Sequence, residues 1–175
     1  MDAYLAIVGK REVRNYTAQP VPDDVLTKIL EAGRASGSSR NRQPWRFIVV
    51  RSQARLRALS AYVTRSTNLT GCAAAIVVVL TNPRSGFDGG RTAQNMMLAA
   101  WTLNVGTCPN SPSDEVAVKR ILGVPDEMGI PTILSLGYPA PGERRPRPKA
   151  DPVKVLSRIS RLPLGELVLN EHYRR

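Results

Sequence analysis

Three cations lie close together near the N-terminus, at Lys10, Arg11 and Arg14. Guanidinium and ammonium groups bind phosphate through charge-assisted hydrogen bonds. Arg11 and Arg14 are three residues apart, so they could converge on one anion if this segment coils. The spacing alone leaves a second interpretation open, in which these side chains form an ordinary solvated charged face.

A polar loop from Ser36 to Trp45 contains Ser38, Ser39 and Asn41 and leads directly into an apolar run. Hydroxyl and amide groups between a helix end and a strand start offer many hydrogen-bond donors to the oxygens of a ligand. Pro44 fixes the direction in which the chain leaves the loop. The composition alone is also that of an ordinary surface loop.

The sequence lacks the usual signatures of nucleotide and metal sites: there is no GxGxxG after a strand, no GxxxxGK[ST], no HExxH and no CxxC. His172 is the only histidine, and Cys72 and Cys108 are too far apart for a metal knuckle. We therefore expect both thiols to be reduced and predict neither a metal site nor a catalytic side chain. An enzyme that lacks side-chain nucleophiles, general bases and metal ligands often depends on a bound cofactor for its reaction.

The chain carries 25 basic and 14 acidic residues, a net charge of +11, which suits partners with phosphate groups, from nucleotides to nucleic acid. Only 5% of residues are aromatic, and no basic run is interleaved with aromatics as in single-strand binding surfaces. Nucleic acid is thus an unlikely partner. A basic polyanion-binding protein without enzymatic activity remains the alternative from another functional class.

The 175 residues, 42% of them hydrophobic, are enough to bury one core, so we expect a single domain over 1–175. No apolar stretch has the length of a membrane span, and the first residues do not form a signal pattern. We therefore expect a cytoplasmic protein.

Hydrophobic periodicity predicts the elements that must position these residues. We expect helices at 3–8, from an Asp23 cap to about Gly33, from a Ser52 cap to Val63, from about Asp88 to a stop at Gly106, and from a Ser113 cap to Leu122. Apolar runs predict interior strands at 47–50, 73–80 and 132–136.

Within the long helix, five apolar residues recur at the spacing of one stripe: Ala93, Met96, Met97, Ala100 and Trp101. We interpret this stripe as core packing, with a dimer interface as the alternative. After Gly137, interleaved prolines and basic residues predict an extended arm over 141–175, which holds nine basic and four acidic residues.

These segments together resemble the FMN-dependent nitroreductase superfamily. Its motifs occur here in order: an N-terminal Arg-rich stretch at 10–16, SSxNxQPWxFxVV at 38–50, a helix of the type DxGxxxQNxxLAAxxLGxG at 88–106 (with Asn at position 104), a strand ending GYP at 136–139, and RxPL at 161–164. Each motif alone is modest, but the ordered set covers essentially the whole chain. The resemblance implies an α+β fold with a central, mostly antiparallel sheet flanked by helices. It also implies a homodimer in which the C-terminal arm reaches the partner subunit.

The resemblance further implies FMN as the cofactor, with Arg11 and Arg161 from opposite ends of the chain binding its phosphate. Lys10 adds a third cation, and Arg14 approaches the N1 and O2 edge of the flavin. Ser38, Ser39 and Asn41 contact the ribityl chain and ring, in part from the neighbouring subunit. Further contacts come at the N5 and O4 edge, from Pro109, Asn110, Ser111 and Gly137.

The chain departs from the family pattern at Glu12, where relatives often have a small hydrogen-bonding residue near the phosphate. A carboxylate there would repel the ligand, so Glu12 must point away, pair with an arginine or weaken binding. We include it among the cofactor-binding candidates for this reason.

The implied reaction passes hydride from NAD(P)H through the flavin to an electron-poor acceptor such as a nitroaromatic or a quinone. Relatives with the same fold also catalyse dehydrogenation and dehalogenation or work with deazaflavins, and the sequence leaves these alternatives open.

Overall fold

The computed structural model describes residues 2–173, and its centre is a four-stranded sheet in the order β1-β2-β4-β3. The strands are β1 (Trp45–Val50), β2 (Ala74–Leu80), β3 (Gly106–Asn110) and β4 (Gly129–Gly137). Each of the three pairings is antiparallel. The expected α+β architecture is confirmed, and β2 and β4 occupy the middle of the sheet.

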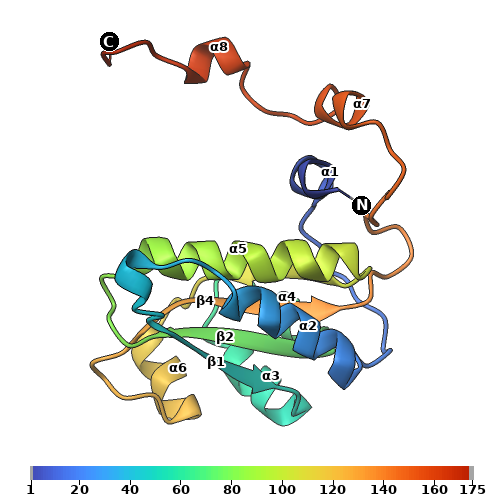
Figure 1. The fold of residues 1–175 in the computed structure, drawn as a ribbon. Helices are drawn as coiled ribbons and strands as arrows, with labels where there is room; N and C mark the ends of the chain where they lie inside the picture. The colour runs from blue at the N-terminus through green and yellow to red at the C-terminus, as the bar shows by residue number, and fades with distance from the viewer. Residues whose placement is uncertain (1, 174–175) are drawn as a thin grey trace.

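Helices cover both faces of this sheet (Figure 1). One face packs against α2 (Asp23–Arg34) and α5 (Gly86–Thr102), through a core that includes Ile76, Val78 and Leu134. The other face includes Val77 and Ile133 and packs beside α3 (Gln53–Ser60), α4 (Thr67–Thr70) and α6 (Glu115–Leu122). Since neighbouring residues of a strand point to opposite faces, β2 is buried along its whole length.

The apolar stripe of α5 faces the core of its own chain. Met96 and Ala100 are fully buried, and Met97 and Trp101 are nearly so. Gly33 of α2 lies so close that a Cβ there would meet the Met96 side chain at 2.8 Å. The packing interpretation of this stripe is therefore confirmed.

Several expected boundaries were wrong. The fourth strand, β3, begins at Gly106, where only a helix stop was expected, and α4 was not predicted. Pro22, not Asp23, is the N-cap of α2, and Asp114, not Ser113, caps α6 by accepting from Ala117 N at 2.9 Å. A basic helix was expected to reach Val63, but α3 ends at Ser60 and Val63 forms an isolated bridge with Pro112.

Helix α1 (Ala3–Gly9) and the C-terminal arm lie on the same side of the sheet (Figure 1). Helix α1 contacts both α5 and α7 (Pro152–Leu156). Beyond α7 the arm continues through α8 (Leu164–Leu167), which lies away from the sheet. The arm expected to be extended over 141–175 therefore contains two short helices, although 142–149 contains neither helix nor strand. Within residues 2–173, no helix is both long and apolar enough to cross a membrane.

Candidate functional site

The N-terminal cations lie on an extended segment that crosses the end of the sheet. Val13 N donates to Thr107 O at 3.1 Å, Thr17 N donates to Tyr138 O at 2.8 Å, and Tyr16 forms a bridge with Pro139. Because the segment does not coil, Arg11 and Arg14 line two different cavities. The possibility that they converge on one anion is therefore excluded.

Two glycines leave room for this segment. Gly106 and Gly137 are paired across β3 and β4. A Cβ on Gly106 would lie 2.6 Å from the Val13 Cβ, and a Cβ on Gly137 would lie 2.8 Å from the Tyr16 side chain. Gly137 therefore leaves space for the N-terminal segment that carries the cations. The sequence did not reveal this structural role.

A cavity of about 300 Å³ lies beside the end of β3. Four of the predicted site residues line it: Arg14, Pro109, Asn110 and Ser111. Sequence reasoning missed the other lining residues, which are Thr64, Arg65, Asn68 and Cys108. The cavity combines two arginines with amide, hydroxyl and backbone groups, so it suits a planar polar ring that carries negative charge.

Asn110 holds the floor of this cavity through its side-chain amide. Its Nδ2 donates to Cys108 O at 2.9 Å and Ile133 O at 3.0 Å, and its Oδ1 accepts from Asn68 Nδ2 at 2.7 Å. These bonds fix the orientation of both amides, and they leave Asn68 Oδ1 buried without a hydrogen-bond partner in the described part of the chain. An unpaired buried acceptor is costly, which favours a ligand that donates a hydrogen bond there.

Replacing Asn110 with leucine should lower the free energy of unfolding by about 3 kcal/mol. The substitution removes several buried hydrogen bonds, and each buried polar group left without a partner costs about 1–3 kcal/mol. Urea denaturation of the purified protein would measure the loss. The matched control is Ser111→Ala at the exposed neighbouring position, which should change stability by less than about 0.5 kcal/mol. Equal stabilities of the two variants would contradict this role of Asn110.

Glu12 forms an ion pair with Lys10. Pairing with an arginine, one of the three possibilities expected from the sequence, does not occur among the described residues. Lys10 Nζ lies 2.6 Å from Glu12 Oε1 and 3.5 Å from Met97 Sδ, and only 6% of the Lys10 side chain is exposed. The carboxylate therefore neutralises the ammonium that was expected to be a third phosphate ligand. Glu12 Oε2 is buried and has no partner among the described residues, so it is a second free acceptor near the cations.

Arg161 lies near enough to Arg11 to repel its positive charge, although the two residues stand at opposite ends of the chain. Arg11 Nη1 donates to Val8 O and Lys10 O, both at 2.8 Å, at the C-terminal end of α1. Burial, followed by repulsion from Arg161 and Arg144, lowers the pKa of Arg11. The structure thus gathers three guanidinium groups without a carboxylate paired to any of them in residues 2–173. Such a cluster is suited to binding a phosphate dianion.

The loop with Ser38, Ser39 and Asn41 lies outside both cavities of its own chain. It packs on α5, where Asn95 Nδ2 donates to Ser36 Oγ at 2.8 Å. Arg40, Asn41 and Gln43 have φ values of 53°, 53° and 49°, and Ser38 Oγ accepts from Gln43 N at 2.9 Å. Ser39 and Asn41 are exposed, so their polar groups can contact a second molecule.

Neither cysteine is poised for thiolate chemistry. Cys72 and Cys108 are free and buried, and burial raises the pKa of Cys72 to about 11 and also raises that of Cys108. A thiol whose pKa is raised by burial remains protonated near neutral pH and is a poor nucleophile. Among the residues that the structure describes, no group of three or more His, Cys, Asp or Glu side chains could hold a metal ion.

Comparisons with known proteins agree on one family. The model of the Nitroreductase family matches residues 7–79 and 81–138. A protein of Archaeoglobus fulgidus named NADH dehydrogenase/NAD(P)H nitroreductase is 33% identical over 144 residues, which cover 76% of this chain and 83% of that protein. An NADH dehydrogenase of Thermus thermophilus is 29% identical, with 80% and 88% of the two chains covered.

Solved structures give the same result for the fold. A Desulfovibrio desulfuricans nitroreductase in complex with FMN superposes with a TM-score of 0.78 at 27% identity, and the match covers 99% of each chain. An FMN-dependent nitroreductase from Clostridium difficile has a TM-score of 0.75 at 26% identity, covering 85% of this chain and 92% of that one.

Proposed function

Because this chain belongs to the nitroreductase family and is a flavin oxidoreductase, we propose that it binds FMN between two copies of itself. We further propose that it passes hydride from NAD(P)H to an electron-poor acceptor such as a nitroaromatic or a quinone. The observation that carries this proposal is the division of the site. Arg11 lines one cavity and Arg14 lines the other, while the loop with Ser38, Ser39 and Asn41 lies outside both cavities of the same chain.

The residues present fit FMN. Arg11 and Arg161 would hold the phosphate, because their positive charges repel each other and neither guanidinium group is paired with a carboxylate in residues 2–173. Asn68 lines the small cavity, and its unpartnered Oδ1 would receive a hydrogen bond from a donor of a polar ligand. When bound, FMN would supply a ring that accepts and releases hydride.

Each group around the small cavity has a distinct task. Arg14 would place a fixed positive charge against the ring edge where negative charge collects on reduction, and thereby favour the reduced state. Pro109, Asn110 and Ser111 would present backbone groups to the opposite edge, with the Asn110 amide holding this strand end in place. No protein side chain needs to move a proton in the first half-reaction.

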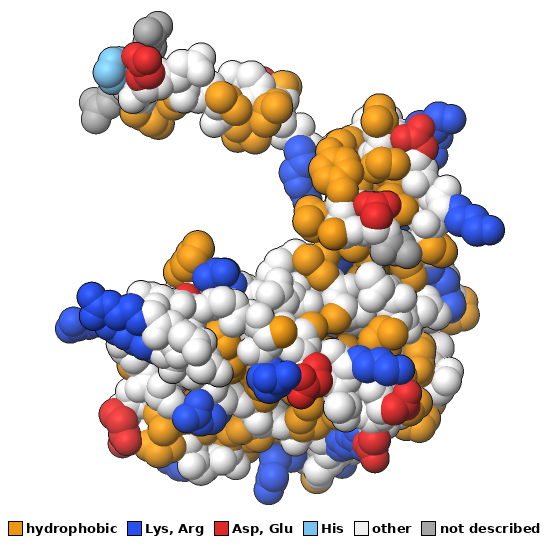
Figure 2. Space-filling model, viewed as in Figure 1, with side chains coloured by type: hydrophobic (Ala, Val, Ile, Leu, Met, Phe, Trp, Pro, Cys, Tyr) orange, Lys and Arg blue, Asp and Glu red, His pale blue; other side chains and the backbone are white. Residues whose placement is uncertain are grey.

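The partner copy would supply Ser38, Ser39 and Asn41 to the ribityl chain and ring. The C-terminal arm also favours a dimer, because it exposes a row of apolar side chains: Val153, Leu156, Leu162, Leu164, Leu167, Val168, Leu169 and Tyr173. Figure 2 shows hydrophobic side chains along the arm, facing the hollow between the arm and the body. Apolar surface of this extent is typical of protein interfaces.

The first test is the visible spectrum of the protein purified without added flavin, before and after anaerobic addition of NADPH or NADH. Flavin bands that bleach with either donor would support the proposal. A colourless protein that does not take up FMN would contradict it.

The second test asks whether one site needs two chains. Arg14→Ala and the double variant Ser38→Ala/Asn41→Ala damage different halves of the proposed site, so each homodimer should lose most activity. Co-expression of the two variants should restore one intact site in each mixed dimer, and hence roughly a quarter of wild-type activity for random pairing. If mixed dimers form without any gain in activity, the site is not shared between chains.

A further inference from the structure

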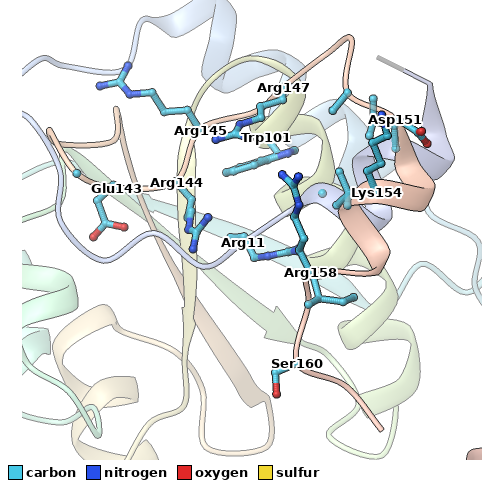
Figure 3. Close-up of a pocket in the computed structure, with 16 residues that line it drawn as sticks. Arg11, Trp101, Glu143, Arg144, Arg145, Arg147, Asp151, Lys154, Arg158 and Ser160 are labelled. Atoms are coloured by element: carbon cyan, nitrogen blue, oxygen red, sulfur yellow. The ribbon is translucent and has the colours of Figure 1, made fainter. Parts of the chain in front are cut away.

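The larger cavity, of about 880 Å³, lies between α1, the 142–150 segment and α7. Figure 3 shows side chains from these three segments gathered around Trp101 of α5. Its lining includes six cations, which are Arg11, Arg144, Arg145, Arg147, Lys154 and Arg158. This volume is near the upper end of the range for small-molecule sites, and exceeds what the phosphate of a single FMN needs.

The two carboxylates that line this cavity, those of Glu143 and Asp151, accept hydrogen bonds from groups other than its cations. Glu143 accepts hydrogen bonds from Asn15 N and Asn15 Nδ2, and Asp151 accepts from Val153 N as the N-cap of α7. No ion pair joins either carboxylate to the six cations within residues 2–173. The lining therefore keeps a net charge of about +4, from six cations and two carboxylates.

Two of the arginines are oriented by backbone groups. Arg145 Nη2 donates to Pro139 O at 2.7 Å, and Arg11 is fixed at the end of α1. Arg11 and Arg144 line the same cavity, and after burial, repulsion from Arg161 and Arg144 contributes to the lowered pKa of Arg11. Bringing like charges together costs free energy, and a bound polyanion would relieve that cost.

The cavity also has an apolar side. Leu5, Trp101, Val155 and Ile159 line it together with the arginines. A nucleotide matches this combination, because its base or ribose can lie against apolar side chains while its phosphates meet guanidinium groups. Inorganic phosphate alone would not use the apolar side.

We propose that this cavity binds the adenosine 2′-phosphate and diphosphate end of NADPH, through Arg144, Arg147 and Arg158, and so makes NADPH the preferred hydride donor. The inference rests on the proposed function, since it assigns the donor of the same flavin site. Arg11 also lines this cavity, but we assign it with Arg161 to the FMN phosphate, and the three arginines named for NADPH are other residues.

The direct probe is adenosine 2′,5′-bisphosphate, titrated calorimetrically into the FMN-loaded protein, with AMP and inorganic phosphate as comparisons. We expect the bisphosphate to bind at least tenfold more tightly than AMP. The double variant Arg147→Gln/Arg158→Gln should weaken it at least tenfold and leave the FMN content unchanged. The matched control is Arg55→Gln/Arg57→Gln on α3, which is exposed on the opposite face of the sheet and should bind like wild type.

Stopped-flow reduction of the bound flavin gives an independent readout. The cavity variant should raise the apparent Kd for NADPH at least tenfold and leave that for NADH unchanged. Equal use of NADH and NADPH by the wild type, or an unaltered Kd for the bisphosphate in the variant, would overturn the inference while leaving the flavoenzyme intact. Loss of FMN in parallel with the bisphosphate would also overturn it, because the cavity would then serve only the FMN phosphate. A wild-type protein that binds no FMN would instead contradict the proposed function itself.

Discussion

Removing both guanidinium groups in the variant Arg11→Ala/Arg161→Ala should weaken FMN binding by roughly 10²–10⁴-fold. A hydrogen bond to a charged group contributes about 1.5–3 kcal/mol, and about 1.4 kcal/mol corresponds to a tenfold change in affinity. Lys10 cannot compensate, because its ammonium is buried and paired with Glu12. Quenching of FMN fluorescence during titration of the apoprotein would measure the change.

A double variant on the other side of the sheet, Arg57→Ala/Arg120→Ala, serves as the control, since both side chains are exposed on α3 and α6. It should bind FMN like the wild type. Melting curves of the apoproteins would establish that both variants fold. Wild-type affinity for FMN in a folded Arg11→Ala/Arg161→Ala variant would exclude these residues as the phosphate ligands.

The second large effect is expected for Gly106→Ala. The new Cβ would lie 2.6 Å from the Val13 Cβ, and Val13 is held by its hydrogen bond to Thr107 O. Overpacking of this kind typically costs about 1–3 kcal/mol. The displaced segment carries Arg11 and Arg14, so the affinity for FMN should fall together with the stability. Chemical denaturation and FMN titration of the same preparation would measure both.

Gly90→Ala is the control, because Gly90 lies in α5, has nothing within 4 Å of an added Cβ and is exposed. It should stabilise the protein by about 0.5–1 kcal/mol through the lower entropy of the unfolded chain. If Gly106→Ala is as stable as Gly90→Ala and retains FMN, the close crossing of the N-terminal segment is not required for the site.

The interior of the fold was predictable because hydrophobic periodicity and burial coincide there. β2 and the apolar stripe of α5 are buried where the pattern placed them. β3 was missed because Gly106 and Pro109 are poor strand formers by composition. It is an edge strand of the sheet, and at an edge a proline without an N–H is tolerated.

The candidate site was predictable only in part. Arg14, Pro109, Asn110 and Ser111 line one cavity, but their positions came from resemblance to a family rather than from periodicity. Asn68 carries no sequence signal, because it lies on a four-residue helix and bonds to Asn110, which is distant in the sequence. The Lys10–Glu12 pair likewise depends on burial that spacing alone does not reveal.

The close approach of Arg11 and Arg161 also bears on the order of events during synthesis. These residues are 150 positions apart, so the ribosome releases the first arginine long before it adds the second. The core strands and helices can form while translation continues, but the proposed phosphate ligands are both present only after Arg161 has been added. On the proposed function, we therefore expect a polypeptide that terminates before Arg161 to bind FMN only weakly.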